Sequence, residues 1–159
     1  MTTNTVQRKD RNLSPGVLVG GAFVFSTLLS ISMHVGEILF TDHDPHAPTG
    51  AIASIESVAV VGGAALVLAL AIAVPLAGDS RRARTGAVVL GSLTVVSLLV
   101  FWSGAPATLG AATAWLGGLA KGSHPQTGIA RGFGIFGIVI AILVIVATMF
   151  GGIAGAVVD

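Results

Sequence analysis

Three of the four histidines lie close to three carboxylates in one short segment, which runs from His34 to His46 and reads HVGEILFTDHDPH. Imidazole and carboxylate groups can exchange protons, and together they supply the nitrogen and oxygen ligands that Zn, Cu(II) and Ni(II) accept. The segment therefore suggests either a proton or cation site or a metal site. Which of these is feasible depends on the elements that position the side chains.

The first half of the segment predicts a candidate proton or cation relay. His34 and Glu37 are three residues apart, so they share one face of a helix. If the next helix runs back antiparallel, Glu56 lies at a similar depth. Ionisable residues within membrane spans are costly and are functional candidates. The alternative is structural: Glu37 reaches headgroups, Glu56 benefits from a helix N-terminus, and His34 forms a hydrogen bond within the bundle.

The second half of the segment is a candidate metal site. Its ligand types belong to Asp42, His43, Asp44 and His46. No further His or Cys cluster on the same side would complete a closed site, so a solvated acidic turn is the favoured interpretation. Haem would need a second histidine within a span besides His34. No resident cofactor is therefore predicted.

The composition is that of a protein dissolved in lipid. Hydrophobic residues make up 53% of the 159 residues, charged residues make up 9%, and there are 22 glycines. The absence of cysteine excludes disulfides and thiolate ligands. The basic residues form small clusters between apolar runs, so no continuous basic face could follow a nucleic acid. The lipid bilayer is the expected environment, and nucleic acid is not an expected partner.

The apolar runs predict an all-α, polytopic bundle of five transmembrane helices. Residues 1–13 are a polar N-terminus, and residues 14–159 form one transmembrane domain. Ser14 and Pro15 have the residue types of a helix N-cap and first turn. By length and composition the spans cover about residues 16–40, 51–77, 86–102, 105–120 and 132–157.

The fourth of these runs has two possible placements. Pro106 separates residues 105–120 from the preceding run, and this stretch either crosses the membrane or lies on its outer surface as an interfacial helix. Crossing leaves all basic residues on the cytoplasmic side with the N-terminus, as the positive-inside rule expects. Five spans are therefore favoured over four spans plus an interfacial helix. The residues expected to anchor the cytoplasmic side to headgroups are Arg81, Arg82, Arg84, Lys121 and Arg131.

Glycines recur within the spans, several of them four residues apart. Such spacing lets helix backbones approach closely in lipid, either within the bundle or against another membrane protein. The candidate packing residues are Gly16, Gly20, Gly62, Gly63, Gly137, Gly151 and Gly155.

Residues 110–150 read GAATAWLGGLAKGSHPQTGIARGFGIFGIVIAILVIVATMF. A short helix of small residues, a glycine-rich loop with a basic residue at each end and a longer helix resemble the helical hairpins of small uncharacterised membrane proteins from high-GC bacteria. The resemblance implies a hairpin here and carries over no functional residue.

No motif for nucleotide binding, hydrolysis or zinc-dependent catalysis is present, so the protein is not expected to be an enzyme. We expect an accessory or assembly subunit of a larger complex in the bacterial plasma (inner) membrane. Its partners would be other subunits or further copies of itself. The alternatives are a proton- or cation-coupled transporter or channel component and a metal- or haem-handling membrane protein.

Overall fold

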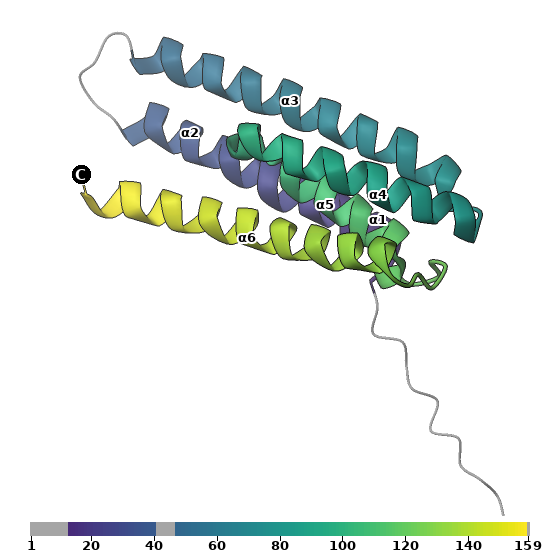
Figure 1. Ribbon diagram of the computed structural model, residues 1–159. Helices are drawn as coiled ribbons and strands as arrows, with labels where there is room; N and C mark the ends of the chain where they lie inside the picture. Colours follow the sequence, from purple (N-terminus) through teal and green to yellow (C-terminus); the bar gives the residue numbers. More distant parts are fainter. Residues whose placement is uncertain (1–12, 41–46, 159) are drawn as a thin grey trace, which may run out of the picture.

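The computed structural model describes residues 13–40 and 47–158, and within these ranges the chain forms helices and connecting turns without a strand (Figure 1). Irregular turns join α1 to α2 and follow α4 and α5. The elements in chain order are α1 (Pro15–Phe23), a π turn (Val24–Leu28), α2 (Leu29–Phe40), α3 (Ala47–Leu76), α4 (Ser80–Ser97), a 3-10 turn (Leu98–Ser103), α5 (Ala105–Ala114), a second π turn (Trp115–Leu119) and α6 (Ile129–Val158).

Local sequence explains where the helices begin. The hydroxyl of Ser14 accepts a hydrogen bond from the backbone N–H of Val17 at 3.4 Å, and Pro15 occupies the first turn. The carboxylate of Asp79 caps α4 by accepting from the N–H of Arg81 at 3.3 Å. Gly104 precedes α5 with a φ of +75°, which a residue with a side chain rarely adopts.

Four stretches of the described chain are long and apolar enough to cross a membrane, which supports the prediction of a polytopic membrane protein. They do not include α5, which is shorter than the usual span. The four candidate spans are Pro15–Val35, Ile52–Leu76, Ser80–Ser103 and Ile129–Phe150.

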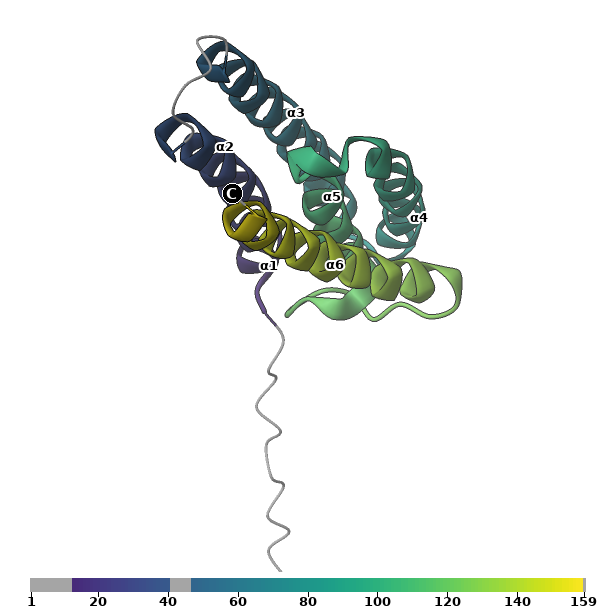
Figure 2. The ribbon, with the colours of Figure 1, turned by 90° about the vertical axis from the view of Figure 1, so that its left-hand side faces the viewer.

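Helix α5 lies in the centre of the bundle, where α1, α3, α4 and α6 surround it (Figures 1 and 2). All ten residues of Ala105–Ala114 are buried. An interfacial helix would leave one face open to solvent or headgroups, whereas the structure places α5 inside the bundle, and whether residues 105–120 cross the membrane stays a prediction. The hairpin of α4 and α5 also ends short of the far ends of α2, α3 and α6 (Figure 1).

Small residues allow α5 to occupy this central position. A Cβ on Gly110 would collide with the carbonyl oxygen of Gly137 on α6, and a Cβ on Gly137 would collide with that of Gly110. One turn beyond α5, a Cβ on Gly117 would lie 2.5 Å from the Cα of Gly134. The two backbones are therefore in direct contact, which is the kind of van der Waals packing that holds helices together in lipid.

Buried hydroxyls satisfy the polar backbone where α4 turns into α5. Ser26 donates to the carbonyl oxygens of Ala22 at 2.7 Å and Gly104 at 3.2 Å. The hydroxyl of Ser103 accepts from the N–H of Ala105 at 3.2 Å. Because an unpaired backbone group is costly away from water, these bonds make a turn inside the bundle possible.

The predicted packing glycines divide into three groups. A Cβ on Gly62 would lie 2.9 Å from Thr27 Oγ1 and from the backbone oxygen of Ser103, so Gly62, like Gly137, stands at a close contact within the bundle. A Cβ on Gly16, Gly20 or Gly63 would meet nothing within 4 Å, so these three do not stand at such a contact among the described residues. Gly151 and Gly155 lie on α6, and their surroundings fall outside what the structure describes.

Candidate functional site

The relay candidates His34 and Glu56 lie toward the end of the bundle where α2 stops and α3 starts. His34 on α2 follows the buried Ser26 and Ser30 at helical spacing and is itself partly buried. Its Nδ1 lies 2.8 Å from the carbonyl oxygen of Ser30, to which it donates in the Nδ1–H tautomer. His34 is therefore held to its own helix on the side that faces the bundle.

Glu56, in contrast to His34, lies on the side of its helix that faces away from the bundle. The buried side of α3 carries Val58, Gly62 and Ala65, whereas Glu56 is exposed and shares its stripe with Val60 and Val67. A shift of two residues from Val58 turns a side chain by about 200° around a helix, which places Glu56 away from the bundle interior. The structure therefore does not bring Glu56 and His34 onto one shared surface.

The remaining candidates of the opening segment are not described at side-chain level. Glu37 lies on α2, and Asp42, His43, Asp44 and His46 lie outside the described residues. Among the residues that the structure does describe, no three His, Asp or Glu side chains gather into a group that could hold a metal ion. The metal site and the part of Glu37 in a relay stay predictions.

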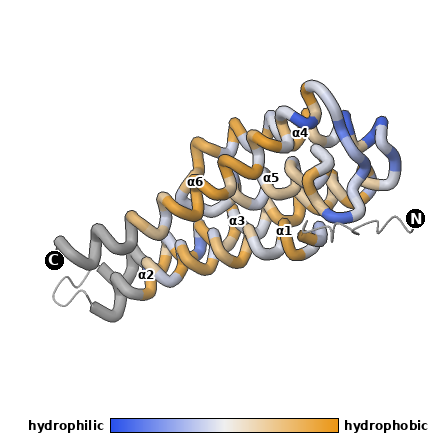
Figure 3. The backbone as a smooth tube through the Cα atoms, turned by 90° about the horizontal axis from the view of Figure 1, so that it is seen from below, coloured by the Kyte–Doolittle hydropathy of each residue, from blue (hydrophilic) through white to orange (hydrophobic). Residues whose placement is uncertain are grey.

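The basic residues gather at the other end of the bundle. Among the described residues, Figure 3 shows the hydrophilic segments concentrated there, at the end where α1 starts. The backbone N–H of Lys121 donates to the carbonyl oxygen of Leu13 at 2.8 Å, which ties the loop after α5 to the start of α1. The residues expected to anchor headgroups, which are Arg81, Arg82, Arg84, Lys121 and Arg131, are all exposed at or near this end.

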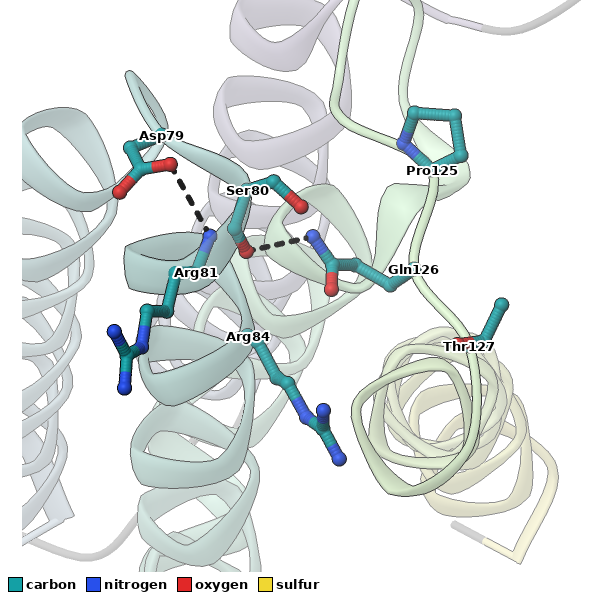
Figure 4. A pocket seen from close by; sticks show the side chains of 7 residues that line it. All are labelled: Asp79, Ser80, Arg81, Arg84, Pro125, Gln126 and Thr127. Atoms are coloured by element: carbon teal, nitrogen blue, oxygen red, sulfur yellow. Dashed lines mark hydrogen bonds between the residues drawn. The ribbon is translucent and has the colours of Figure 1, made fainter.

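A pocket of about 400 Å³ opens at this basic end (Figure 4). It lies between the start of α4 and the segment that leads into α6. Gln126 closes one side, because its Nε2 donates to the carbonyl oxygen of Ser80 at 3.1 Å and its side chain is only 5% exposed. The pocket is lined by Asp79, Ser80, Arg81, Arg84, Pro125, Gln126 and Thr127.

The helix directions add positive potential to the same end. Helices α1, α4 and α6 all begin there, and the N-terminus of a helix carries a partial positive charge. Among the described residues of this end, Asp79 is the one acid, and its carboxylate already accepts the capping hydrogen bond from Arg81. The chemistry that this arrangement offers is recognition of an anion.

Sequence reasoning missed Gln126 and Thr127. Both lie in a glycine- and proline-containing loop and match no motif, and the partner of Gln126 is 46 residues earlier in the chain. A polar residue that is buried within a loop is a sign of such a tertiary contact, but burial is not visible in the sequence.

Sequence reasoning also missed Thr27. Its side chain is 2% exposed, and its Oγ1 has no hydrogen-bond partner among the described residues. A lone threonine in an apolar run gives no signal of this kind, because threonine usually bonds to its own helix.

Comparison with known proteins gives no relative for this chain. No protein-family model matches it, and neither a curated protein nor a solved structure is significantly similar to it. Functional proposals therefore rest on the residues and their geometry.

Proposed function

We propose that this chain is a non-catalytic accessory subunit of a membrane protein complex, and that it binds its partner through the outward face of α3. The observation that carries this proposal is the position of Glu56. An ionisable residue within a span almost always faces the interior of its bundle or a water-filled cavity. Glu56 faces away from the bundle, although it lies within a hydrophobic candidate span.

The neighbours of Glu56 make the outward face apolar. Val60 and Val67 are each 69% exposed, and Val74 continues the same side of α3 toward the basic end. A carboxylate next to such a stripe loses hydration, and Glu56 has no ion-pair or hydrogen-bond partner among the described residues. A lysine, arginine or amide of a neighbouring subunit would offset this cost and would fix the position of the partner along α3.

The same face offers room for close approach. Gly63 lies between Val60 and Val67, and a Cβ added to it would meet nothing within 4 Å. Gly16 and Gly20 leave similar free space on α1. Small residues at a free surface let another helix come within backbone contact distance, which replaces the hydrophobic driving force that lipid does not provide.

The position of Glu56 along α3 indicates at which level of the membrane a partner group could meet it. Glu56 lies 20 residues before Leu76, the last residue of α3. At about 1.5 Å per residue this is about 30 Å, close to the thickness of the hydrocarbon core. With the basic end at the cytoplasmic surface of a bacterial plasma membrane, as the positive-inside rule favours, Glu56 lies near the outer boundary of the apolar layer. The partner should present its cation or amide at that level.

Photocrosslinking in the native membrane tests this proposal. A photoreactive residue in place of Val67 should form an adduct with one defined membrane polypeptide other than a second copy of this chain. The same residue in place of Val96, which is exposed on α4, should form no such adduct. Replacing Glu56 by Leu should lower the adduct yield at position 67 at least five-fold, because the partner loses its polar contact.

Ile52→Leu is the matched control, because Ile52 is exposed one turn from Glu56 on the same side of α3 and the exchange leaves the charge unaltered. It should leave the yield unchanged. An adduct that forms equally with Glu56→Leu, or a lack of any adduct from position 67, contradicts the proposed role of this face. An adduct to a second copy of this chain would indicate a homo-oligomer and would contradict the role as an accessory subunit.

A further inference from the structure

The pocket at the basic end has the chemistry of an anion site, and it is separate from the outward face of α3. We propose that it binds a phosphate group. Two sources would present that group at this end of the bundle, the headgroup of an anionic phospholipid and a free phosphate ion. Both would be recognised by the same side chains.

Arg84 supplies the principal positive charge. Arg84 lines the pocket, and its guanidinium projects from α4 toward the side where the segment with Thr127 lies (Figure 4). A guanidinium presents several N–H donors in one plane, which matches two oxygens of a phosphate. The side chain of Arg81 leaves α4 on the other side, so it contributes charge at a longer range (Figure 4).

Two hydroxyls and an amide complete the set of donors. Ser80 and Thr127 line the pocket from its two walls, and a hydroxyl can donate to a phosphate oxygen. Gln126 uses one of its N–H groups to bind the carbonyl oxygen of Ser80, and that bond joins the two walls. Because Gln126 is buried, the walls are held at a fixed spacing before a ligand arrives, which lowers the entropic cost of binding.

The one carboxylate of the pocket does not oppose an anion directly. Asp79 accepts the hydrogen bond that caps α4, and in Figure 4 its side chain lies on the far side of Ser80 from Arg84. The start of α4 adds its partial positive charge at Ser80, and the start of α6 follows Thr127. The pocket therefore combines a cation, hydroxyl donors and a positive helix end at the level where inner-leaflet phosphates would lie.

The test measures ligand-induced stabilisation of the full chain in a neutral detergent. The apparent melting temperature is followed while either short-chain phosphatidylglycerol or inorganic phosphate is added, with chloride at equal ionic strength as the reference. At least one of the two phosphate compounds should raise it in a saturable manner. Arg84→Gln should weaken the apparent affinity at least ten-fold.

Arg82→Gln is the matched control, because Arg82 is an exposed neighbour of the same charge that does not line the pocket. It should change the affinity less than two-fold. Thr127→Val, which keeps the net charge, should weaken binding about three-fold, which is less than 1 kcal/mol at about 1.4 kcal/mol per factor of ten. This second variant keeps the test valid if Arg84→Gln lowers expression.

The two ligands distinguish the source of the phosphate. Arg84-dependent stabilisation by phosphatidylglycerol alone assigns the site to a lipid headgroup, and equal stabilisation by inorganic phosphate assigns it to a free anion. An equal loss in Arg82→Gln and Arg84→Gln would show general attraction to a basic surface and would overturn the proposal. Wild-type affinity in both Arg84→Gln and Thr127→Val, or no stabilisation by either compound, would overturn it as well.

Discussion

At the scale of single residues, the buried hydroxyls differ in whether they have partners. Thr94 donates to the carbonyl oxygen of Leu90 at 2.8 Å and lies 3.3 Å from the hydroxyl of Thr113, which joins α4 to α5. Thr27 is equally buried, yet its Oγ1 has no partner among the described residues. An unpaired buried hydroxyl costs free energy, whereas a paired one is about neutral or favourable.

We therefore expect opposite effects from the same exchange at these two positions. Thr27→Val should raise the free energy of unfolding by about 1 kcal/mol, because valine keeps the shape and removes the unpaired group. Thr94→Val should lower it by about 1 kcal/mol, because the hydrogen bonds of its hydroxyl to the carbonyl oxygen of Leu90 and to the hydroxyl of Thr113 are both lost. Equilibrium unfolding in mixed micelles gives both values. A loss in Thr27→Val as large as that in Thr94→Val would mean that the Thr27 hydroxyl is paired.

At the scale of elements, the contact between α5 and α6 is the feature that keeps the short helix inside the bundle. Gly110 and Gly137 meet backbone to backbone, and Gly117 and Gly134 repeat the contact further along. A methyl group at either level must push the two helices apart. The cost of such overpacking in a protein core is typically about 1–3 kcal/mol.

Gly137→Ala should accordingly lower the free energy of unfolding by about 1–3 kcal/mol. Gly132→Ala on the same helix is the matched control, because a Cβ there would meet nothing within 4 Å. It should leave stability unchanged or raise it by up to about 1 kcal/mol, since alanine favours helix over glycine. Thermal unfolding of the two variants beside the wild type is the measurement, and equal stability of both would contradict close packing of α5 on α6.

The sequence predicts the positions of the long helices along the chain more reliably than it predicts which helices pack against one another. Apolar runs of spanning length identify the four candidate spans, since lipid requires them. The placement of α5 was open because a short run of alanine, glycine and threonine suits both a membrane surface and a crowded interior. The buried side of α3 is also hard to predict, because its exposed valines and its buried alanines are both apolar.

The candidate sites were predicted to different extents for a similar reason. The positive-inside rule, together with the expected crossing of residues 105–120, predicts that Arg81, Arg84 and Lys121 gather at one end. The pocket between Arg84 and Thr127 depends on which loop folds against α4, and no local pattern reports that. The outward direction of Glu56 likewise depends on which side of α3 meets α5.

At the scale of the whole molecule, the helix α5 returns the chain through the centre of the bundle to the basic end. Four candidate spans surround it, and the turn that precedes it is closed by hydroxyls and glycines. This arrangement puts the start of α4 and the loop between α5 and α6 at one end, while the end of α2 and the start of α3 lie at the opposite end (Figure 1). In a membrane the two ends would face different compartments.

Cysteine accessibility in intact cells tests this arrangement most directly, because the native chain has no cysteine and each variant carries a single reporter thiol. Arg82→Cys and His124→Cys should both resist a membrane-impermeant thiol reagent until the membrane is permeabilised. His43→Cys, in the connection between α2 and α3, should react from outside without permeabilisation. Labelling of position 124 from outside together with position 43, while position 82 stays protected, would contradict the return of the chain through α5.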